Sequence, residues 1–340
     1  MKVMAMMSGG VDSSVAAALL RDQGHDVTGV TLKLWGGESD SGCCSVSDVE
    51  DARRVAAQLG IPHYVFNFSD AFDAHVVDPY ARAYEAGRTP NPCVECNRTM
   101  KFGRVLDRAV QLGYDAVATG HHARVRQTAR GLAVARGADP AKDQSYVLFM
   151  LGPAELARTL LPVGELTKAE VRERAAALGL RTARKPESMD VCFITNGGRE
   201  SFLGARISRR PGSVVDMRGS VVGRHQGIDR FTIGQRRGLA VAAGERRYVT
   251  DIEPNTGTVT IGTRTDLLRD HVDLVDTTWV SGHPPAGPVL AQWRAHGQAV
   301  PARVDDDRVH FDLPQTRVAP GQVVACYDGD AVLGGGIAFT

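Results

Sequence analysis

The chain has 340 residues, of which 43% are hydrophobic and 23% charged, and its formal net charge is +1 at pH 7. This composition is typical of a globular protein of two or three domains and excludes collagen-like, disordered and coiled-coil classes. No apolar run approaches the ~20 residues that span a bilayer, and the first residues lack the basic start and apolar core of a signal peptide. We therefore expect a cytoplasmic protein without membrane contact.

Short apolar runs alternate with amphipathic runs from residue 1 to about residue 194. The apolar runs predict strands at 3–7, 25–34, 64–68 and 115–119. The amphipathic runs predict helices at 15–20, 49–59, 71–85, 100–112 and 171–178. Two of these helices follow capping boxes, Ser47-x-x-Glu50 and Thr167-x-x-Glu170. Such alternation indicates a parallel sheet with helices on both faces, whose ligands bind beyond the carboxyl ends of the strands.

The composition changes after about Arg199, where Gly, Pro, Val and Thr dominate and turn signals such as Pro211-Gly212 recur. This half is typical of one or two small β-barrels. Between Arg199 and Arg247, eleven arginines stand against four acidic residues, a local excess of +7. Charge alone leaves two interpretations open, a phosphate-binding face and a solvated arginine-rich surface.

A glycine-rich turn between the first predicted strand and the first helix is the strongest motif, Ser8-Gly9-Gly10-Val11-Asp12-Ser13-Ser14. Its N–H groups and hydroxyls would face an anion at the positive end of the helix, and its glycines let phosphate approach the backbone. It has neither the Gly-Lys-Ser/Thr of a Walker A loop nor the G-x-G-x-x-G of a dinucleotide loop. It resembles the loop of the PP-loop ATP pyrophosphatases, which adenylate a carbonyl oxygen. That resemblance implies ATP and, through Asp12, Mg²⁺.

Cys93 and Cys96 form a single C-x-x-C in a proline-flanked stretch, which we expect to be a stiff loop between helices. Half a zinc site, a redox pair, an activated thiol and an accidental pair all fit this spacing. A helix expected from about Thr99, carrying Lys101, favours the thiolate of Cys96. Six cysteines are too few for a disulfide scaffold of this length.

The remaining cysteines and polar clusters carry weaker signals. Cys192, between Val191 and Phe193, is locally typical of a core cysteine, and Cys43, Cys44 and Cys326 receive no role. Four polar clusters are typical, one by one, of capped turns or surface histidines: Gly120-His121-His122, Lys142-Asp143-Gln144-Ser145, His225-Gln226-Gly227 and Gly234-Gln235-Arg236-Arg237-Gly238.

Taken together, these stretches resemble the tRNA-specific 2-thiouridylases, PP-loop enzymes that thiolate the wobble uridine. The resemblance runs over nearly the full chain. It is carried by the Ser8–Ser14 loop, Thr89-Pro90-Asn91-Pro92 with Cys96-Asn97, Ala118-Thr119-Gly120-His121, Lys142-Asp143-Gln144-Ser145-Tyr146, Val191-Cys192-Phe193-Ile194, Phe231-Thr232-Ile233-Gly234-Gln235-Arg236-Arg237-Gly238-Leu239 and Leu333-Gly334-Gly335-Gly336.

The resemblance implies a fold in three regions. These are an α/β, doubly wound parallel-sheet PP-loop domain (adenine nucleotide alpha hydrolase-like) at 1–199, a central β-rich basic domain at 200–265 and a C-terminal β-barrel at 266–340. The central domain contains most of the arginine-rich segment, which would track tRNA phosphates.

The resemblance also implies roles for individual residues. Cys96 would be the catalytic nucleophile, and Cys192 would carry persulfide sulfur. ATP would contact Met6, Met7, Ser8, Gly9, Gly10, Val11, Asp12, Ser13, Leu32 and Gly120. The target base would contact Asn91, Pro92 and Cys93. The rest of the tRNA would contact His121, Lys142, Asp143, Gln144, Arg294 and Gln322.

The implied reaction is ATP-dependent 2-thiolation of the wobble uridine. ATP converts the uracil C2 oxygen into an adenylate, and a persulfide then delivers sulfur, leaving a Cys96–Cys192 disulfide or releasing sulfide as the nucleophile. The base would be splayed into the pocket. The implied partners are tRNA with a wobble uridine and an upstream sulfur donor, either a cysteine desulfurase or a sulfur relay protein.

The chain departs from the family pattern at two positions. Some members have Asp where this chain has Cys93, which puts an acid/base role there in doubt, and Ala295 follows Arg294 where an aromatic residue is familiar. Cys93, Cys96 and Cys192 would suffice to hold a [4Fe–4S] cluster with one open iron, and the sequence does not choose between cluster and persulfide. Two rival functions are a PP-loop ligase that makes lysidine or an amide, and an RNA-binding module with structural ATP.

Overall fold

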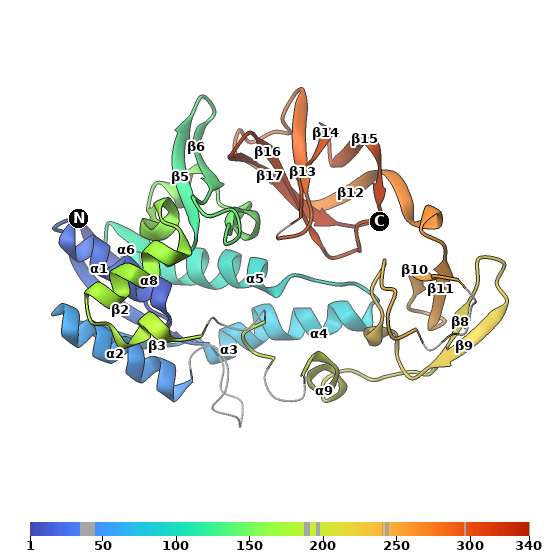
Figure 1. The fold of residues 1–340 in the computed structure, drawn as a ribbon, viewed down its shortest axis with the longest axis horizontal. Helices are drawn as coiled ribbons and strands as arrows, with labels where there is room; N and C mark the ends of the chain where they lie inside the picture. The colour runs from blue at the N-terminus through green and yellow to red at the C-terminus, as the bar shows by residue number, and fades with distance from the viewer. Residues whose placement is uncertain are drawn as a thin grey trace.

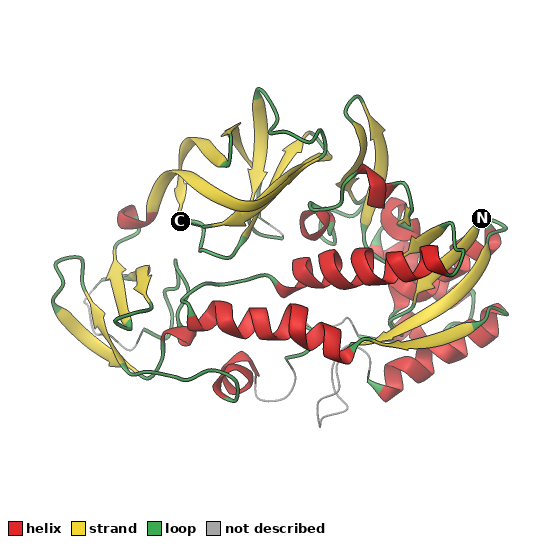
Figure 2. Cartoon of the chain, turned by 180° about the vertical axis from the view of Figure 1, so that it is seen from behind, coloured by secondary structure: helices red, strands yellow, loops and turns green. Residues whose placement is uncertain are grey.

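The computed structural model describes residues 1–34, 45–186, 191–194, 198–239, 241, 245–295 and 297–339. Its strands form a five-stranded, a four-stranded and an eight-stranded sheet. The N-terminal α/β part and the central β part lie at opposite ends of the long axis, with the C-terminal barrel beside both (Figure 1). Two helical runs, one containing α4 (Asp78–Glu85) and one beginning with α5 (Pro92–Glu95), lie side by side between these two parts in both views (Figure 2).

The N-terminal sheet is parallel and has the strand order β3-β2-β1-β4-β7. Its strands are β1 (Lys2–Met6), β2 (Asp26–Lys33), β3 (His63–Asn67), β4 (Ala116–Ala118) and β7 (Thr159–Leu160). The order runs outward from β1 in both directions, so β1 and β4 meet at the switch point where such sheets bind ligands. The predicted doubly wound parallel sheet is therefore confirmed.

Helices cover both faces of this sheet because successive side chains of a strand point to opposite sides. Val3 and Ala5 of β1 pack in one core with α1 (Val11–Asp22), α2 (Val46–Leu59) and α8 (Lys168–Ala177). Met4 and Met6 pack in a second core on the other face. That core includes residues of α3 (Ser69–Phe72), α4 (Asp78–Glu85), α5 (Pro92–Glu95), α6 (Leu106–Gln111) and the π-helical segments Asp73–Val77 and Cys96–Val105.

Three predicted helix starts are wrong. The helix expected from residue 15 begins at Val11, within the predicted glycine turn. The helix expected from residue 100 begins at Pro92, so Cys93 and Cys96 lie on helical residues and not in a loop. Proline is favoured at the first helical position, where its missing N–H costs nothing, and the Asn91 side chain caps the helix by accepting from the Cys93 N–H. The cap of α2 is Ser45, not Ser47; its hydroxyl accepts from the Asp48 N–H. The Thr167 capping box is confirmed.

A hairpin that the sequence analysis did not predict joins the N-terminal part to the barrel. Its strands are β5 (Ala123–Thr128) and β6 (Gly131–Arg136), and β6 pairs with the barrel through Ala135 and Ala331. The remaining helical turns are α7 (Pro153–Leu156) and α9 (Gly198–Gly204), with 3-10 turns at Ser145–Leu148, Pro162–Glu165, Arg181–Arg184, Ile228–Arg230 and Thr265–Leu267.

The second half is β-rich, as predicted. The central sheet has the order β10-β11-β8-β9 and consists of β8 (Gly212–Val215), β9 (Val221–His225), β10 (Tyr248–Glu253) and β11 (Thr258–Gly262). The C-terminal barrel consists of β12 (Leu268–Trp279), β13 (Pro288–Gln292), β14 (Val300–Asp305), β15 (Arg308–Thr316), β16 (Val323–Asp328) and β17 (Ala331–Ala338). Pairing of β12 with β17 closes these six strands.

The terminal glycine motif has a structural explanation at this closure. Gly334 has φ +135°, and a Cβ there would lie 2.1 Å from the carbonyl oxygen of Thr278 on β12. Only glycine lets the two strands approach this closely. Across the described residues, no helix has the length and apolar character needed to cross a membrane.

Candidate active site

A cavity of about 480 Å³ lies beyond the carboxyl ends of β1 and β4. It brings together most of the residues singled out from the sequence: Met6, Met7, Ser8, Gly10, Val11, Asp12, Ser13, Leu32, Pro92, Cys93, Cys96, Gly120, His121, Lys142, Asp143, Gln144 and Cys192. The lining does not include Gly9, Asn91, Arg294 or Gln322. Segments from positions 6 to 192 thus converge on one space.

The glycine turn is built to receive an anion at the start of α1. Gly10 occupies the N-cap position and provides no side-chain cap, so the first N–H groups of the helix stay available to a ligand. The Ser13 hydroxyl accepts from the Ser8 N–H at 3.1 Å and donates to the Gly10 carbonyl at 3.1 Å. The Ser14 hydroxyl donates to the same carbonyl at 2.8 Å. These bonds hold the turn in its curved shape.

Two glycines are required because other backbone lies against them. Gly9 has φ +73°, and a Cβ there would lie 2.3 Å from the carbonyl oxygen of Asp48. A Cβ on Gly120 would lie 2.6 Å from the backbone nitrogen of Ser13. Gly9 therefore packs the turn on α2, and Gly120 packs the end of β4 on α1.

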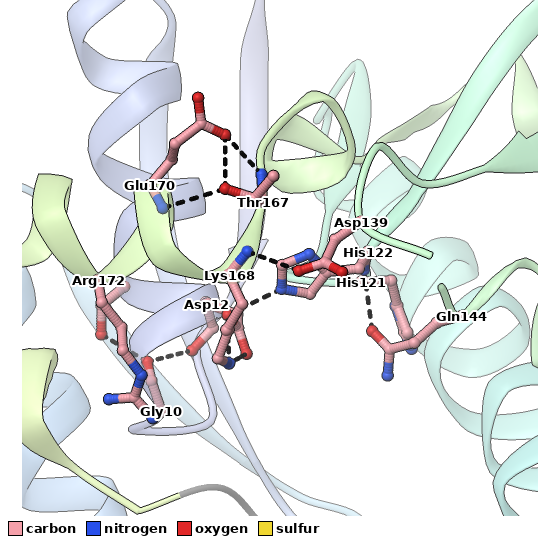
Figure 3. Close-up of polar contacts among 12 residues, drawn as sticks. Gly10, Asp12, His121, His122, Asp139, Gln144, Thr167, Lys168, Glu170 and Arg172 are labelled. Atoms are coloured by element: carbon pink, nitrogen blue, oxygen red, sulfur yellow. Dashed lines mark hydrogen bonds and ion pairs between the residues drawn. The ribbon is translucent and has the colours of Figure 1, made fainter. Parts of the chain in front are cut away.

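Asp12 forms a charged cluster with two residues that sequence reasoning did not assign (Figure 3). Its carboxylate accepts from Lys168 Nζ at 2.7 and 2.8 Å and contacts His122 Nε2 at 3.0 Å. Burial acts to raise the pKa of Asp12, but the bonds from His122 and Lys168 outweigh it, and the pKa is lowered. Lys168 follows the N-cap Thr167, where the helix dipole disfavours a cation. A lysine directly after a helix N-cap is therefore the feature of the sequence that could have pointed to Lys168.

Lys185 links the glycine turn to α2. Its ammonium donates to the Gly9 carbonyl at 3.0 Å, Asp48 Oδ1 at 2.6 Å and Asp51 Oδ2 at 2.7 Å. Burial acts to lower the pKa of Lys185, yet hydrogen bonds to Asp48 and Asp51 raise it. The side chain is 26% exposed. No local pattern in the sequence marks Lys185, because its three partners come from two distant segments.

Cys96 and Cys192 line this cavity from two different elements. Cys96 is 7% exposed and stands one turn into the helix that begins at Pro92. Cys192 is half-buried, while the adjacent Phe193 is buried, with its ring 5.7 Å from Phe72 and 5.3 Å from Tyr80. Phe193 is thus a member of the core, and Cys192, for which a core position was expected, is only partly buried against the same core. Residues 187–190 and Cys43 and Cys44 lie outside the described residues.

His121 is buried on the cavity wall and is held neutral. Its Nδ1 lies 2.7 Å from Thr119 Oγ1 and its Nε2 lies 3.5 Å from Lys101 Nζ. Burial, followed by the charge of Lys101, lowers the pKa of His121 well below its usual value. The neutral ring accepts from Lys101 through Nε2 and donates to Thr119 through Nδ1.

Asp143 connects the cavity wall to the barrel. Its carboxylate accepts from the Gly137 N–H at 2.9 Å, the Ser145 hydroxyl at 2.8 Å and Arg136 at 3.0 Å. Arg136 also donates to Gln292 at 2.7 Å and lies 3.9 Å above the Tyr327 ring. Gln292 in turn donates to the carbonyls of residues 294 and 295, and the latter residue lines the cavity. The barrel therefore supplies part of the wall.

The thiols do not form a preorganised metal centre. Throughout the described part of the chain, no three or more Cys, His, Asp or Glu side chains are grouped closely enough to hold a metal ion. Cys93, Cys96 and Cys192 share the cavity without forming such a group. The residues present thus do not fit a [4Fe–4S] cluster in this conformation.

Comparisons with known proteins cover nearly the whole chain. Family models match residues 1–196, 200–263 and 269–338; they describe a tRNA methyl transferase HUP domain, a tRNA methyl transferase PRC-barrel domain and an aminomethyltransferase beta-barrel domain. A relative from Roseiflexus sp. (strain RS-1), named tRNA-specific 2-thiouridylase MnmA, is 50% identical over 98% of each chain. A relative of the same name from Chloroflexus aurantiacus (strain ATCC 29366 / DSM 635 / J-10-fl) is 49% identical over 98% of this chain and 97% of its own.

A solved structure of a 4-thiouridine synthetase–RNA complex with bound ATP is more distant. It is 19% identical, covers 56% of this chain and 44% of its own, and superposes with a TM-score of 0.39.

Proposed function

The chain belongs to the tRNA-specific 2-thiouridylase family, and we propose that it is a tRNA-uridine 2-sulfurtransferase acting with ATP on the wobble uridine, the first anticodon position. Full-length relatives at about half identity support the activity and the tRNA substrate. One observation carries the proposal: Cys96 and Cys192, far apart in the sequence, line one cavity with the anion-binding glycine turn. Methyl transfer, which the family models' descriptions mention, would leave both thiols and the turn without a purpose.

The first proposed step activates the uracil. Its C2 oxygen, a poor leaving group, attacks the α-phosphate of ATP, and pyrophosphate leaves while AMP stays on the oxygen. The uncapped start of α1 and the hydroxyls of Ser8 and Ser13 would bind the phosphates. Lys168, which contacts Asp12 at the same place, would neutralise pyrophosphate charge as it develops. Met6, Met7, Leu32 and Gly120 would contact the rest of the nucleotide.

Asp12 is the residue that would hold the Mg²⁺ accompanying ATP. The described cavity lining contains two carboxylates, Asp12 and Asp143, and both have partners: Lys168 and His122 for Asp12, Arg136 and Ser145 for Asp143. They differ in exposure, since the Asp143 side chain is only 4% exposed. The Asp12 side chain is 29% exposed on the turn itself, and carboxylate oxygen is the ligand type that Mg²⁺ prefers. When bound, the ion offsets phosphate charge.

The second proposed step transfers sulfur. Cys192 carries a persulfide, loaded by an upstream donor, whose outer sulfur attacks C2 and expels AMP. The Cys96 thiolate then attacks the inner sulfur, the Sγ of Cys192; the S–S bond to the transferred sulfur breaks, and that sulfur stays on C2 as the thiocarbonyl. A Cys96–Cys192 disulfide remains, and a thiol reductant resets it.

tRNA would enter with its wobble base splayed into the cavity. Pro92 and Cys93 line that cavity and Asn91 caps their helix, so these three residues are the proposed base contacts. His121, Lys142, Asp143, Gln144 and Arg294 are proposed contacts for the surrounding nucleotides. We place the boundaries between the catalytic, central and barrel domains at 199 and 265, and the arginine-rich segment of the central domain would follow the phosphates.

The test incubates the protein with unmodified tRNA, Mg-ATP and a persulfide source, and measures pyrophosphate release and 2-thiouridine in the nucleoside digest. We expect thiolation by the wild type and its loss, by at least ~100-fold, in Cys96→Ser and Cys192→Ser, because each thiol has a covalent role. Cys326→Ala is the matched control: Cys326 is fully buried in the barrel core, where burial raises the pKa of its thiol to about 12.

Three results would contradict the proposal. Cys96→Ser and Cys192→Ser at full activity would favour the adenylating ligase that joins an amine. Absence of pyrophosphate release with tRNA and ATP would favour an RNA-binding module. Thiolation only by brown, iron-containing protein prepared anaerobically would replace the persulfide with a cluster.

A further inference from the structure

Thr89 lies at the junction of all three parts of the protein. It belongs to the short linker between α4, which ends at Glu85, and the cysteine helix, which begins at Pro92. Its N–H donates to the Pro320 carbonyl at 2.7 Å, and its carbonyl accepts from Gln322 Nε2. Its hydroxyl donates to Thr232 Oγ1 at 3.3 Å. One residue is therefore held by the barrel through its backbone and by the central part through its side chain.

The contact between Gly321 of the C-terminal part and the linker at Thr89 is close enough to require glycine. Gly321 has φ +90°, and a Cβ there would lie 3.1 Å from the carbonyl carbon of Thr89 and 3.2 Å from the Pro90 nitrogen. On the other side of the linker, Gly87 has φ +67°, and a Cβ there would lie 2.9 Å from Ile252 of the central sheet. The linker is thus packed against both β parts.

The residues that hold Thr89 are themselves anchored. Gln322 donates its backbone N–H to Ala319, and its carbonyl accepts from Ala338 on β17. Ala319 is buried in the core of the central part. Thr232 stands between Phe231 and Ile233, which are buried in that same core. Displacement of either β part would therefore be transmitted to Thr89.

Thr89 precedes the helix cap by two residues, so its position sets where that helix starts. Asn91 accepts from the Cys93 N–H at 3.1 Å, and Cys96 follows on the cavity wall. Pro90 and Pro92 each fix one backbone dihedral and stiffen the path between Thr89 and the helix. A shift at Thr89 would therefore reach the thiol of Cys96.

We propose that Gln322 and Thr232 are positioning residues for the cysteine helix, through which the two β parts set the place of Cys96. The expected effect on the thiolation rate rests on the proposed function, whereas the expected effect on the position of Cys96 does not. It assigns a purpose to Thr89 and to the motif 231–239, which the proposed chemistry left unexplained. It also gives Gln322 a role inside the protein in place of a direct tRNA contact.

The test compares Gln322→Ala and Thr232→Val with the wild type in the full-length protein. With tRNA and ATP saturating, we expect the single-turnover thiolation rate to fall roughly 10- to 100-fold, because small misplacements of a reacting group have effects of that size. The dissociation constant for unmodified tRNA should stay within about twofold, since neither side chain binds RNA in this account. Thr232→Ser keeps the hydroxyl and should retain the wild-type rate.

A second measurement does not depend on thiolation. Alkylation of Cys96 by iodoacetamide, followed by peptide mass spectrometry, should be about fivefold faster in Gln322→Ala and Thr232→Val, the shift that loss of one hydrogen bond produces. Gln315→Ala is the matched control, a barrel glutamine whose amide bonds the Leu313 carbonyl on its own strand, and it should change neither quantity.

The outcomes separate the two proposals. Weaker tRNA binding by Gln322→Ala with an unchanged saturated rate would make Gln322 a tRNA contact and overturn the inference. Unchanged alkylation and unchanged rate in both variants would also overturn it. If the wild type forms no 2-thiouridine but alkylation of Cys96 is still faster in both variants, the proposed function is refuted and the positioning role is supported.

Discussion

Replacing Gly9 with alanine would push the glycine turn off α2. The new methyl group would lie 2.3 Å from the Asp48 carbonyl oxygen and 2.9 Å from that residue's Cα. Non-bonded carbon and oxygen atoms settle at about 3.3 Å, so the turn or the helix must move by roughly 1 Å. Both Asp48 and the Gly9 carbonyl are held by Lys185, which resists the movement. The φ of +73° adds about 1 kcal/mol of backbone strain for an L-residue.

Gly60→Ala separates the strain from the collision. Gly60 ends α2 with φ +69°, and nothing lies within 4 Å of a Cβ built there. Both variants should lose about 1 kcal/mol of unfolding free energy from strain. Only Gly9→Ala should also lower kcat/KM for ATP, by about 100-fold, because the displaced turn misplaces the phosphates by about 1 Å.

The assay is pyrophosphate release with saturating tRNA over a range of ATP concentrations, beside urea denaturation of each variant. Equal kcat/KM for ATP in Gly9→Ala and Gly60→Ala would refute the reasoning, because it would show that contact between the turn and α2 does not position ATP.

Two further predictions concern buried charge. Lys185→Met removes three hydrogen bonds and leaves the carboxylates of Asp48 and Asp51 without their shared cation. Urea denaturation should therefore show a free energy of unfolding lower by about 2–3 kcal/mol. An unchanged free energy of unfolding would contradict this role of Lys185. Burial and Lys101 keep the pKa of His121 well below its usual value. Below about pH 6.5 the unfolded state therefore binds more protons than the folded state, so stability falls as the pH falls. For this group the free energy of unfolding changes by at most about 1.4 kcal/mol per pH unit. Thermal unfolding between pH 5 and 8 should therefore show a flatter dependence in His121→Gln, and identical slopes would rule this out.

The local patterns of the sequence were sufficient for four of the five strands of the parallel sheet and for the glycine turn after β1, but not for β7. Strand-to-helix alternation and the glycines after β1 depend on neighbours within a few residues, so they can be predicted without tertiary contacts. The Thr167 capping box was predicted for the same reason, since Thr167 and Glu170 bond each other across a single helical turn. The family resemblance named many of the residues that line the cavity but not His122 or Lys168, and the individual roles of the named residues remain predictions.

Tertiary structure decided what depends on distant partners. Nothing near Lys185 in the sequence indicates that Gly9, Asp48 and Asp51 surround its ammonium. The β5–β6 hairpin was missed because part of its pairing comes from β17, two hundred residues away along the chain. Local sequence misplaces the start of the cysteine helix because prolines favour loops, whereas Asn91 supplies a cap that makes Pro92 a first helical residue. Hydrogen bonds within one turn can be predicted from sequence order, but a buried charge or an edge strand is stabilised by whichever segment the fold brings beside it.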